Sequence, residues 1–495
     1  MRKIEHGAHG RSPIADLPRR RRIHSNYRRQ ITMNISHSIV RRSSEKRRQR
    51  LAGKDLRVTL TPPGIGVLLI VLVGSASLAG TAHAVPSFAR QTNLGCSACH
   101  TNYPQLNAFG RNFKLRGYSL QSGDVALYKR LSGMLQPSFT RTAKDQAGGA
   151  APHFDPNDNF ALTQGSIFYG GRLLDGYDKL GGFVQVTYDG VGRDLSWDLV
   201  DFRWADSGSL AGKPLTWGVD LNNAPSVQDL WNTSPIWGYP FSGSGLAPGP
   251  SAATLISDPL AGTSAGLGAF ADWNNTLYGE VTLYKTLGSG FLKVVGIDDV
   301  DQEIKGVAPY WRLALRRTSG PHNVELGTFG LYARAYPGRD RSAGKTDRYV
   351  DAGVDLQYEY AGQGRDVVAR AAWIHEDQRL DASSLLGGSS NRSNRLNTLA
   401  LSVSYLYDQT YGVNVGYNHI SGTGDAALYG GSPDSDYYTL QLDWLPLNKN
   451  SGPGSRYSTF NPKISLQYTA YTKLDGVGSG ESDNNTLYLQ AWLTL

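Results

Sequence analysis

The chain has 495 residues, a formal net charge of +8, 40% hydrophobic residues and two cysteines. The excess of positive charge lies in residues 1–57, which hold 17 Lys and Arg against four Asp and Glu and so have a net charge of +13. Residues 58–84 carry no charge, so residues 85–495 have a net charge of −5. Because the basic stretch lies in a segment expected to be removed, nothing in the composition of the remaining chain suggests a polyanion partner, and no nucleic-acid partner is expected.

Residues 1–84 have the features of an export signal with a long basic leader. The apolar run over residues 65–78 is too short to span a bilayer comfortably, and Ala82-His83-Ala84 has the A-x-A pattern of a cleavage site. We therefore expect the mature chain to begin at Val85. A start at Met33 would also explain the length of the leader, and a nucleic-acid-binding arm is the competing interpretation of its arginines.

Both cysteines follow this signal directly, in the string Cys96-Ser97-Ala98-Cys99-His100. This is the CxxCH pattern in which two thiols bond to the vinyl groups of a haem and the adjacent imidazole binds the iron. A disulfide, a redox-active CxxC or half of a zinc site are the alternatives, although zinc would need ligands from elsewhere and the chain has no second cysteine pair. Export favours haem, since c-type haems are attached outside the cytoplasm. The sequence therefore predicts one covalently attached haem c, with His100 as the proximal iron ligand.

Residues 85–124 form the predicted c-type cytochrome segment, which is too small to have a core of its own. Tyr103, Leu106, Phe109 and Phe113 recur at helical spacing and are expected to cover one face of the haem. The other face must be covered by the rest of the chain. We therefore expect this short helical segment to plug the inside of the domain that follows.

Residues 125–495 have the pattern of an all-β domain, a transmembrane antiparallel β-barrel. Segments of about ten residues alternate apolar and polar side chains, as where Val350 and Val354 alternate with Asp351 and Asp355, and breaks rich in Gly, Asn, Asp and Ser separate them. No second long apolar run is present, which excludes a helical membrane protein. A soluble sandwich can alternate in the same way. Export, 27 Tyr, 10 Trp and a chain that ends on a strand favour the outer membrane of a Gram-negative bacterium.

About sixteen such segments are present, which is the size of a porin. One break, residues 222–263, is far longer than a turn and is expected to fold into or over the barrel mouth, with a flexible extracellular loop as the alternative. The strands are predicted to begin near Lys129, Phe160, Lys179, Asp194, Pro214, Ala265, Thr276, Val307, His322, Asp347, Asp366, Leu396, Thr410, Tyr437, Lys463 and Asn485.

Met134 is the candidate distal ligand of the haem iron. It is the only methionine after residue 84, and it shares its strand phase with Ser132 and Gln136, so it should face the lumen. A thioether is suited to an axial position, where it raises the reduction potential; a gap-filling packing role is the alternative. The rival ligands are four histidines, of which the first has most in its favour: His153, His322, His375 and His419.

Four stretches carry a family resemblance: VPSFARQT at 85–92, CSACHT at 96–101, YPQLNAFGRNFKLRGY at 103–118 and VQDLWNTSPIWG at 227–238. They resemble the fused monohaem cytochrome-porins of the bacterial outer membrane, whose best-known members oxidise ferrous iron at the cell surface. The resemblance implies that Cys96, Cys99 and His100 are the haem positions. It also implies extracellular Fe(II) as the electron donor, a periplasmic cytochrome or copper protein as the acceptor, and an iron:cytochrome c oxidoreductase if the chain is an enzyme.

Two other functions stay open. One keeps the architecture with a different extracellular donor or acceptor, and the other is a passive porin whose CxxC forms a disulfide. No motif of a hydrolase or a phosphate-binding enzyme is present. Carboxylates in the inward phase are candidates for attracting the iron cation, with the ordinary polar lining of a wet pore as the alternative: Asp198, Asp220, Glu280, Asp351, Asp355, Glu359 and Asp443.

Overall fold

The computed structural model describes residues 87–119, 125–225, 227–231, 239–257, 259–298, 300–450 and 460–495. The expected signal, its cleavage site, the mature start at Val85 and the alternative start at Met33 lie outside the described residues. Within the described ranges, no helix combines the length and the apolar character needed to cross a bilayer.

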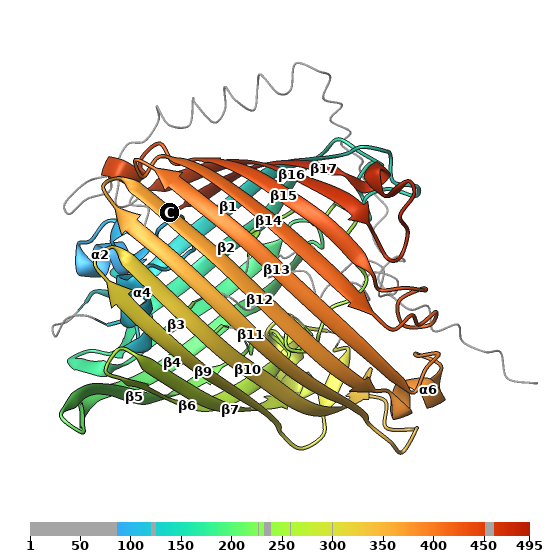
Figure 1. Ribbon diagram of the computed structural model, residues 1–495, viewed down its shortest axis with the longest axis horizontal. Coiled ribbons are helices and arrows are strands. Elements are labelled where there is room, and N and C mark those ends of the chain that lie inside the picture. The colour runs from blue at the N-terminus through green and yellow to red at the C-terminus, as the bar shows by residue number, and fades with distance from the viewer. Residues whose placement is uncertain are drawn as a thin grey trace, which may run out of the picture.

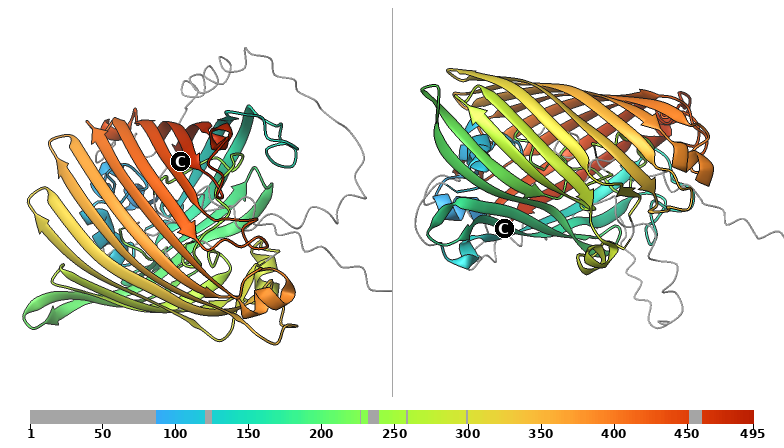
Figure 2. Two further views of the ribbon diagram at one scale, coloured as in Figure 1. Left: turned by 45° about the vertical axis from the view of Figure 1, so that its right-hand side comes forward. Right: turned by 90° about the horizontal axis from the view of Figure 1, so that it is seen from below.

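Sixteen long strands form one closed antiparallel barrel (Figures 1 and 2). Each pairs with its neighbours along the chain, and β17 closes the barrel by pairing with β1, where Leu135 lies opposite Leu493. A short extra strand, β8 (Gln302–Ile304), pairs with the end of β10. The long strands are β1 (Leu131–Thr142), β2 (Asn159–Leu174), β3 (Tyr177–Asp189), β4 (Asp194–Leu210), β5 (Lys213–Asn222), β6 (Ser264–Trp273), β7 (Leu277–Thr286), β9 (Ala308–Ser319), β10 (His322–Pro337), β11 (Asp347–Gly362), β12 (Arg365–Arg379), β13 (Ser393–Tyr407), β14 (Tyr411–Gly422), β15 (Ser435–Trp444), β16 (Asn461–Lys473) and β17 (Thr486–Thr494).

The predicted alternation holds in space. On β11, Val354 is 48% exposed on the outer surface, whereas Asp355 is 2% exposed on the lumen side. All sixteen predicted strand starts lie within three residues of the observed ones. A closed barrel leaves no unpaired sheet edge, and an apolar exterior requires a lipid surrounding. The predicted fold is therefore confirmed, and the protein is a barrel of the Gram-negative outer membrane.

The two ends of the barrel differ in the length of their connections. At one end the strands are joined by tight turns such as residues 175–176, 320–321 and 363–364. At the other end most connections are long, and two carry helices, α5 (Ser289–Val294) and α6 (Asp381–Leu386). Outer-membrane barrels have short periplasmic turns and long extracellular loops. The end at which β1 begins, on the left of Figure 1, is therefore the periplasmic one.

The N-terminal segment lies inside this periplasmic end. It consists of α2 (Ser87–Thr92), α3 (Cys96–Cys99), α4 (Ala108–Leu115) and a 3-10 turn, η1 (Leu127–Lys129), and two further 3-10 turns, η3 (Asn448–Asn450) and η5 (Glu481–Asn484), lie in later connections. The helix α4 begins where the Asn107 side chain accepts a hydrogen bond from Gly110 N. Its Phe113 and Leu115 are buried.

Contacts of this segment reach strands on opposite sides of the barrel. Gln91 Nε2 donates to the carbonyl of Gly170 on β2 at 2.7 Å, and Tyr118 donates to Asp201 on β4 at 2.5 Å. Across the lumen, Arg111 pairs with Glu359 on β11 at 2.7 Å. Asn102 Nδ2 donates to Asp443 on β15 at 2.6 Å, and Lys463 on β16 donates to the carbonyl of Tyr103 at 2.7 Å. The segment is therefore surrounded by the wall.

The connection between β5 and β6 also lies inside the barrel over its described residues. Trp231 packs on Tyr278 of β7, and the hydroxyl of Ser244 bonds that of Thr140 on β1 at 2.6 Å. Further on, Leu255 N donates to Glu376 on β12 at 2.6 Å. The connection thus crosses from one wall to another and, with the N-terminal segment, fills much of the lumen.

The ion pair of Arg111 with Glu359 is expected to hold α4 in place. Glu359→Gln removes the counter-charge from a buried guanidinium, which costs about 3–5 kcal/mol when a buried pair is broken. We expect the amides of α4 to exchange with deuterium roughly 100-fold to 5000-fold faster in the variant. Glu303→Gln, which removes half of an exposed pair with Arg341, is the control and should change nothing measurable. Wild-type exchange in Glu359→Gln would show that the pair does not anchor the helix.

Candidate cofactor site

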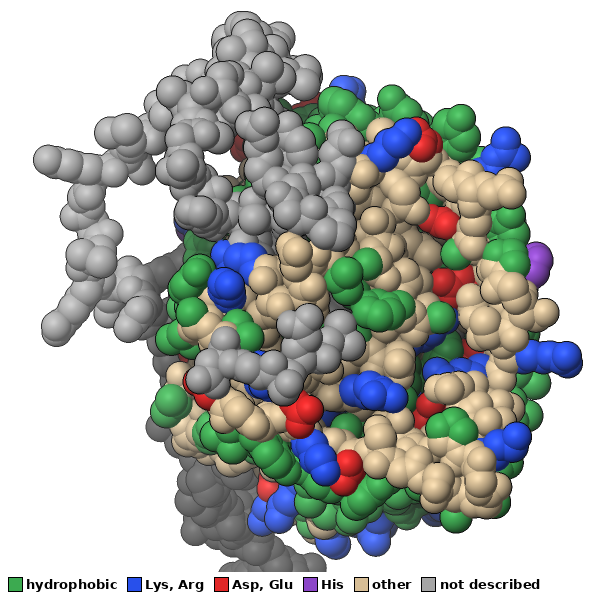
Figure 3. Space-filling model, turned by 90° about the vertical axis from the view of Figure 1, so that its left-hand side faces the viewer, with side chains coloured by type: hydrophobic (Ala, Val, Ile, Leu, Met, Phe, Trp, Pro, Cys, Tyr) green, Lys and Arg blue, Asp and Glu red, His purple; other side chains and the backbone are tan. Residues whose placement is uncertain are grey.

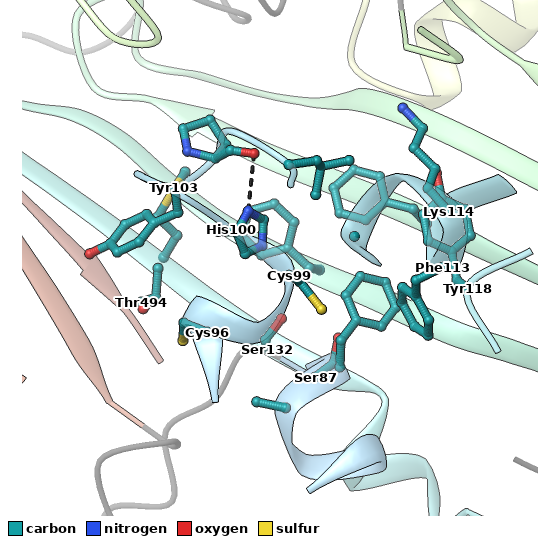
Figure 4. Close-up of a pocket in the computed structure, with 18 of the residues that line it drawn as sticks. Ser87, Cys96, Cys99, His100, Tyr103, Phe113, Lys114, Tyr118, Ser132 and Thr494 are labelled. Carbon is teal, nitrogen blue, oxygen red and sulfur yellow. Dashed lines mark hydrogen bonds between the residues drawn. The ribbon is translucent and has the colours of Figure 1, made fainter. Parts of the chain in front are cut away.

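A largely apolar cavity of about 260 Å³ lies between the N-terminal helices and the wall formed by β17, β1, β2 and β3 (Figure 4). The structure brings all four predicted site residues to its lining: Cys96, Cys99, His100 and Met134. The rest of the lining is dominated by aromatic rings, among them Phe88, Phe113, Tyr118, Phe168, Phe183 and Trp492.

The two cysteines lie one helical turn apart on α3, which brings them to the same side of the helix. Both thiols are free. Burial raises the pKa of the Cys99 thiol to about 12 and also raises the pKa of Cys96. Redox-active cysteines have lowered pKa values because the thiolate is the nucleophile. The surroundings of these thiols therefore do not favour the redox-active CxxC interpretation.

His100 is held in one tautomer. Its Nδ1 lies 3.1 Å from the carbonyl oxygen of Pro104. Because a carbonyl oxygen only accepts, Nδ1 carries the proton and Nε2 keeps the lone pair. Burial lowers the pKa of His100 to about 4, so the imidazole is neutral near pH 7. A neutral imidazole whose other nitrogen is tied to a carbonyl is the usual form of a metal-binding histidine.

Figure 4 shows how these groups are arranged. The imidazole of His100 and the thiol of Cys99 lie between Tyr103 on one side and Phe113 and Tyr118 on the other. Leu106 also lines the cavity, but Phe109 is 42% exposed and does not. The expectation that Phe109 covers the haem is therefore wrong, because α4 turns that side chain away from the cavity.

Met134 faces the lumen from β1, as its strand phase predicts. It is 4% exposed, whereas the neighbouring Leu135 is 40% exposed on the outer surface. Its sulfur accepts a hydrogen bond from Gln136 Nε2 at 3.2 Å. Within the described lining, Met134 is the only thioether and His100 the only imidazole. A thioether and an imidazole on one cavity are a suitable pair of axial donors for a haem iron.

The four rival histidines lie elsewhere. His153 is exposed in the connection between β1 and β2. His322 contacts Tyr358, His375 contacts Asn397 at 2.8 Å, and His419 contacts Asp436 at 2.6 Å. None of the four is among the described residues that line the cavity.

Sequence reasoning missed the wall residues that complete the site. The buried ammonium of Lys463 lies over the rings of Tyr103 and Trp492, with 4.9 and 4.6 Å to the ring centroids. Lys463 itself does not line the cavity, whereas Trp492 and Phe241 of the inward connection do. For Lys463 on β16 and Trp492 on β17, the inward strand phase was the only signal in the sequence. Both residues, like Phe241, lie more than 100 residues from the haem motif.

The seven inward carboxylates proposed to attract iron are all buried on the lumen side. Two of them pair with arginines: Asp355 lies 2.6 Å from Arg312, and Glu359 pairs with Arg111. Asp443 accepts from Asn102, Asn414, Gln441 and Ser465. In the described part of the chain, no group of three or more His, Cys, Asp and Glu is arranged to hold a metal ion. Three of the seven contact the lumen contents, because Glu359 pairs with Arg111, Asp443 accepts from Asn102 and Asp351 accepts from Ile256 N.

No protein-family model and no curated protein matches the chain. Solved structures with a similar fold include the Salmonella typhi OmpF complex with daunomycin, at 13% identity and a TM-score of 0.43 over 74% of this chain and 97% of that one. The outer membrane channel DcaP of Acinetobacter baumannii has 12% identity and a TM-score of 0.42 over 76% of this chain and 100% of that one. The anion-selective porin from Comamonas acidovorans has 12% identity and a TM-score of 0.41 over 74% and 98%.

At these identities and TM-scores the likeness carries no inference about ligand or activity. The strand pairing, the strand number and the apolar exterior make the chain an outer-membrane β-barrel of porin-like size.

Proposed function

We propose that the chain is an outer-membrane electron-transfer cytochrome that carries one covalent haem c in the cavity, accepts electrons from extracellular Fe(II) and passes them to a periplasmic carrier. The observation that supports this best is the convergence of Cys96, Cys99 and His100 on one apolar cavity inside a membrane barrel. When bound, haem c supplies a one-electron couple whose potential depends on its axial ligands and its surroundings.

The residues of the cavity fit such a group. Cys96 and Cys99 would hold its vinyl carbons, and His100, neutral and oriented by Pro104, would bind the iron through Nε2. Met134, which lines the same cavity, would supply a second donor to the iron. The aromatic rings around them would exclude water, and a dry surrounding together with a thioether ligand raises a haem potential.

The position of the cavity is compatible with transfer to a periplasmic carrier. It lies at the periplasmic end, so a periplasmic cytochrome or copper protein would approach it from that side. Electrons from outside would have to pass the part of the barrel that the connection between β5 and β6 occupies. The activity would be that of an iron:cytochrome c oxidoreductase.

A second candidate keeps the haem and changes the extracellular donor or acceptor. It is favoured by the pairing of inward carboxylates such as Asp355 and Glu359 with arginines, because such oxygens are engaged within the protein. A donor that stays outside the lumen would not need them.

Covalent haem attachment is the first test. Wild-type protein made in cells with a cytochrome c maturation system should retain haem after denaturing electrophoresis, because thioether bonds survive detergent. Cys96→Ser with Cys99→Ser should remove the haem-stained band while the barrel still inserts and stays resistant to extracellular protease. An unstained wild-type band would contradict the proposal and favour a passive porin.

Met134 is tested by its spectrum. Met134→Ala should convert a six-coordinate low-spin haem into a high-spin one and lower the midpoint potential, because the thioether ligand is lost. Met134→His should restore a low-spin spectrum at a lower potential. The matched control is Leu135→Ala, which changes the neighbouring side chain on the outer surface. An unchanged low-spin spectrum in Met134→Ala would exclude this residue as the ligand.

Fe(II) as donor is tested by stopped-flow reduction of the oxidised protein. We expect the haem absorbance to change to that of the reduced form at a rate proportional to Fe(II) concentration. The same protein mixed with dithionite reports the rate for an unspecific reductant. Reduction by dithionite but not by Fe(II) at any pH tested would favour the second candidate.

A further inference from the structure

We propose that Gln136 is a positioning residue for the distal iron ligand, and that its amide holds the thioether of Met134 and raises the midpoint potential of the haem. The inference rests on the proposed function, in which Met134 binds the iron. Gln136 Nε2 donates a hydrogen bond to the sulfur of Met134 at 3.2 Å. Both side chains face the lumen from β1, because alternate residues of a strand share a face.

The amide contacts the sulfur without lining the cavity. Met134 is part of the described lining, whereas Gln136 is not. A group bound in the cavity therefore need not displace the amide. A thioether sulfur has two lone pairs, so one can bind iron while the other accepts the hydrogen bond from Gln136.

The contacts of its oxygen fix the orientation of the Gln136 amide. Oε1 accepts from Gln490 Nε2 on β17 at 2.8 Å and from Ser242 Oγ, in the connection between β5 and β6, at 3.4 Å. Because an amide oxygen only accepts, these contacts leave Nε2 to face the sulfur. The barrel wall and the inward connection thus hold the amide together.

This hydrogen-bond network is closed to solvent. Gln136 and Gln490 are each 2% exposed, and Ser242 is buried as well. Figure 3 shows the periplasmic end of the barrel, where side chains and backbone of the described residues cover much of the mouth. A hydrogen bond is electrostatically stronger in such a dry surrounding than in water. The amide therefore acts on the sulfur without competition from solvent.

The contact predicts the direction in which the haem potential changes. Donation of a hydrogen bond withdraws electron density from the sulfur and so weakens its donation to iron. Ferric iron depends on that donation more than ferrous iron does, so the hydrogen bond favours the ferrous form and raises the midpoint potential. An apolar surrounding also raises the potential. A lower potential after an apolar substitution at Gln136 would therefore identify the lost hydrogen bond rather than the lost polarity.

The experiment compares haem-loaded wild type with Gln136→Leu and Gln136→Asn by spectroelectrochemistry. Gln136→Leu removes the donor, and Gln136→Asn keeps the amide but shortens its reach by one methylene. At the wild-type midpoint potential, we expect the ratio of ferric to ferrous haem to rise roughly 2-fold to 10-fold in both variants, the range for the loss of one hydrogen bond. Both variants should stay low-spin and should shift the sulfur-to-iron charge-transfer band of the ferric form.

Gln378→Leu is the matched control, because it makes the same change at another buried glutamine of the lumen. Gln378 lies on β12, where its Nε2 donates to Glu376 at 2.6 Å and to Tyr429 at 3.1 Å. Its variant should have the potential of the wild type. After Gln136→Leu, Gln490 Nε2 still has Ser242 and Tyr488 as acceptors, so the substitution leaves that amide paired.

A double mutant tests whether the effect passes through the sulfur. In the Met134→Ala background the sulfur is absent, so Gln136→Leu should no longer lower the midpoint potential. A shift of equal size in that background would overturn the inference. Wild-type potentials and charge-transfer bands in both single Gln136 variants would also overturn it, and would leave the proposed haem intact.

Two further outcomes separate this inference from the proposals on which it rests. An unchanged low-spin spectrum in Met134→Ala would overturn the inference together with the distal ligand, while the haem assignment stands. A wild-type protein without haem would overturn the proposed function first. If Gln136→Leu does not fold, Gln136→Asn carries the same test.

Discussion

A barrel of sixteen strands encloses more space than its own inward side chains can fill. This constraint governs the rest of the molecule. The chain meets it twice, with the N-terminal segment at the periplasmic end and with the connection between β5 and β6 farther in. Because both fillers are made of main chain as well as side chains, the lumen needs many hydrogen-bonding partners, and the inward face of each strand supplies them.

The contents of the lumen are held largely by buried polar contacts. Arg312 contacts Glu325 and Asp355 and lies 3.8 Å from Asp229 of the inward connection, while its guanidinium carbon is 5.1 Å from the centroid of the Trp231 ring. Buried ion pairs add little net stability compared with apolar packing, yet breaking one is costly. Contacts of this kind fix the position of a filler more than they increase the stability of the barrel.

The cavity differs from the rest of the lumen in being apolar. It lies where three aromatic rings of the N-terminal segment, Phe88, Phe113 and Tyr118, pack on one another with centroid distances of 5.0 to 6.2 Å. Tyr118 meets Phe183 on β3, and Phe168 on β2 and Trp492 on β17 line the same cavity. An apolar region inside a polar lumen is the surrounding that a haem macrocycle requires.

The barrel could be predicted from sequence because each strand residue faces either the lipid or the lumen. Side chains alternate between the two faces of a strand, so the alternation of apolar and polar residues shows which face each residue occupies. The same reasoning correctly oriented Met134. It did not find the contact of Lys463 with Tyr103, which are 360 positions apart, or that of Arg370 with Phe241. Such contacts depend on which strands face each other across the lumen and on where the N-terminal segment and the connection between β5 and β6 lie inside it. Neither property produces a local sequence pattern. The partners of Asp355 and Glu359 were missed for the same reason.

The burial of the cysteines has a consequence for how the protein is made. Cys96 is 8% exposed, and both thiols lie on a segment surrounded by the wall. An enzyme that attaches haem needs access to both sulfur atoms, and in the closed barrel Cys96 is buried and Cys99 half-buried. A haem on these thiols would therefore have to be attached while the chain is still in transit through the periplasm, before β17 meets β1. The machinery that inserts the barrel would then receive a chain that already carries its cofactor and would close the wall around it.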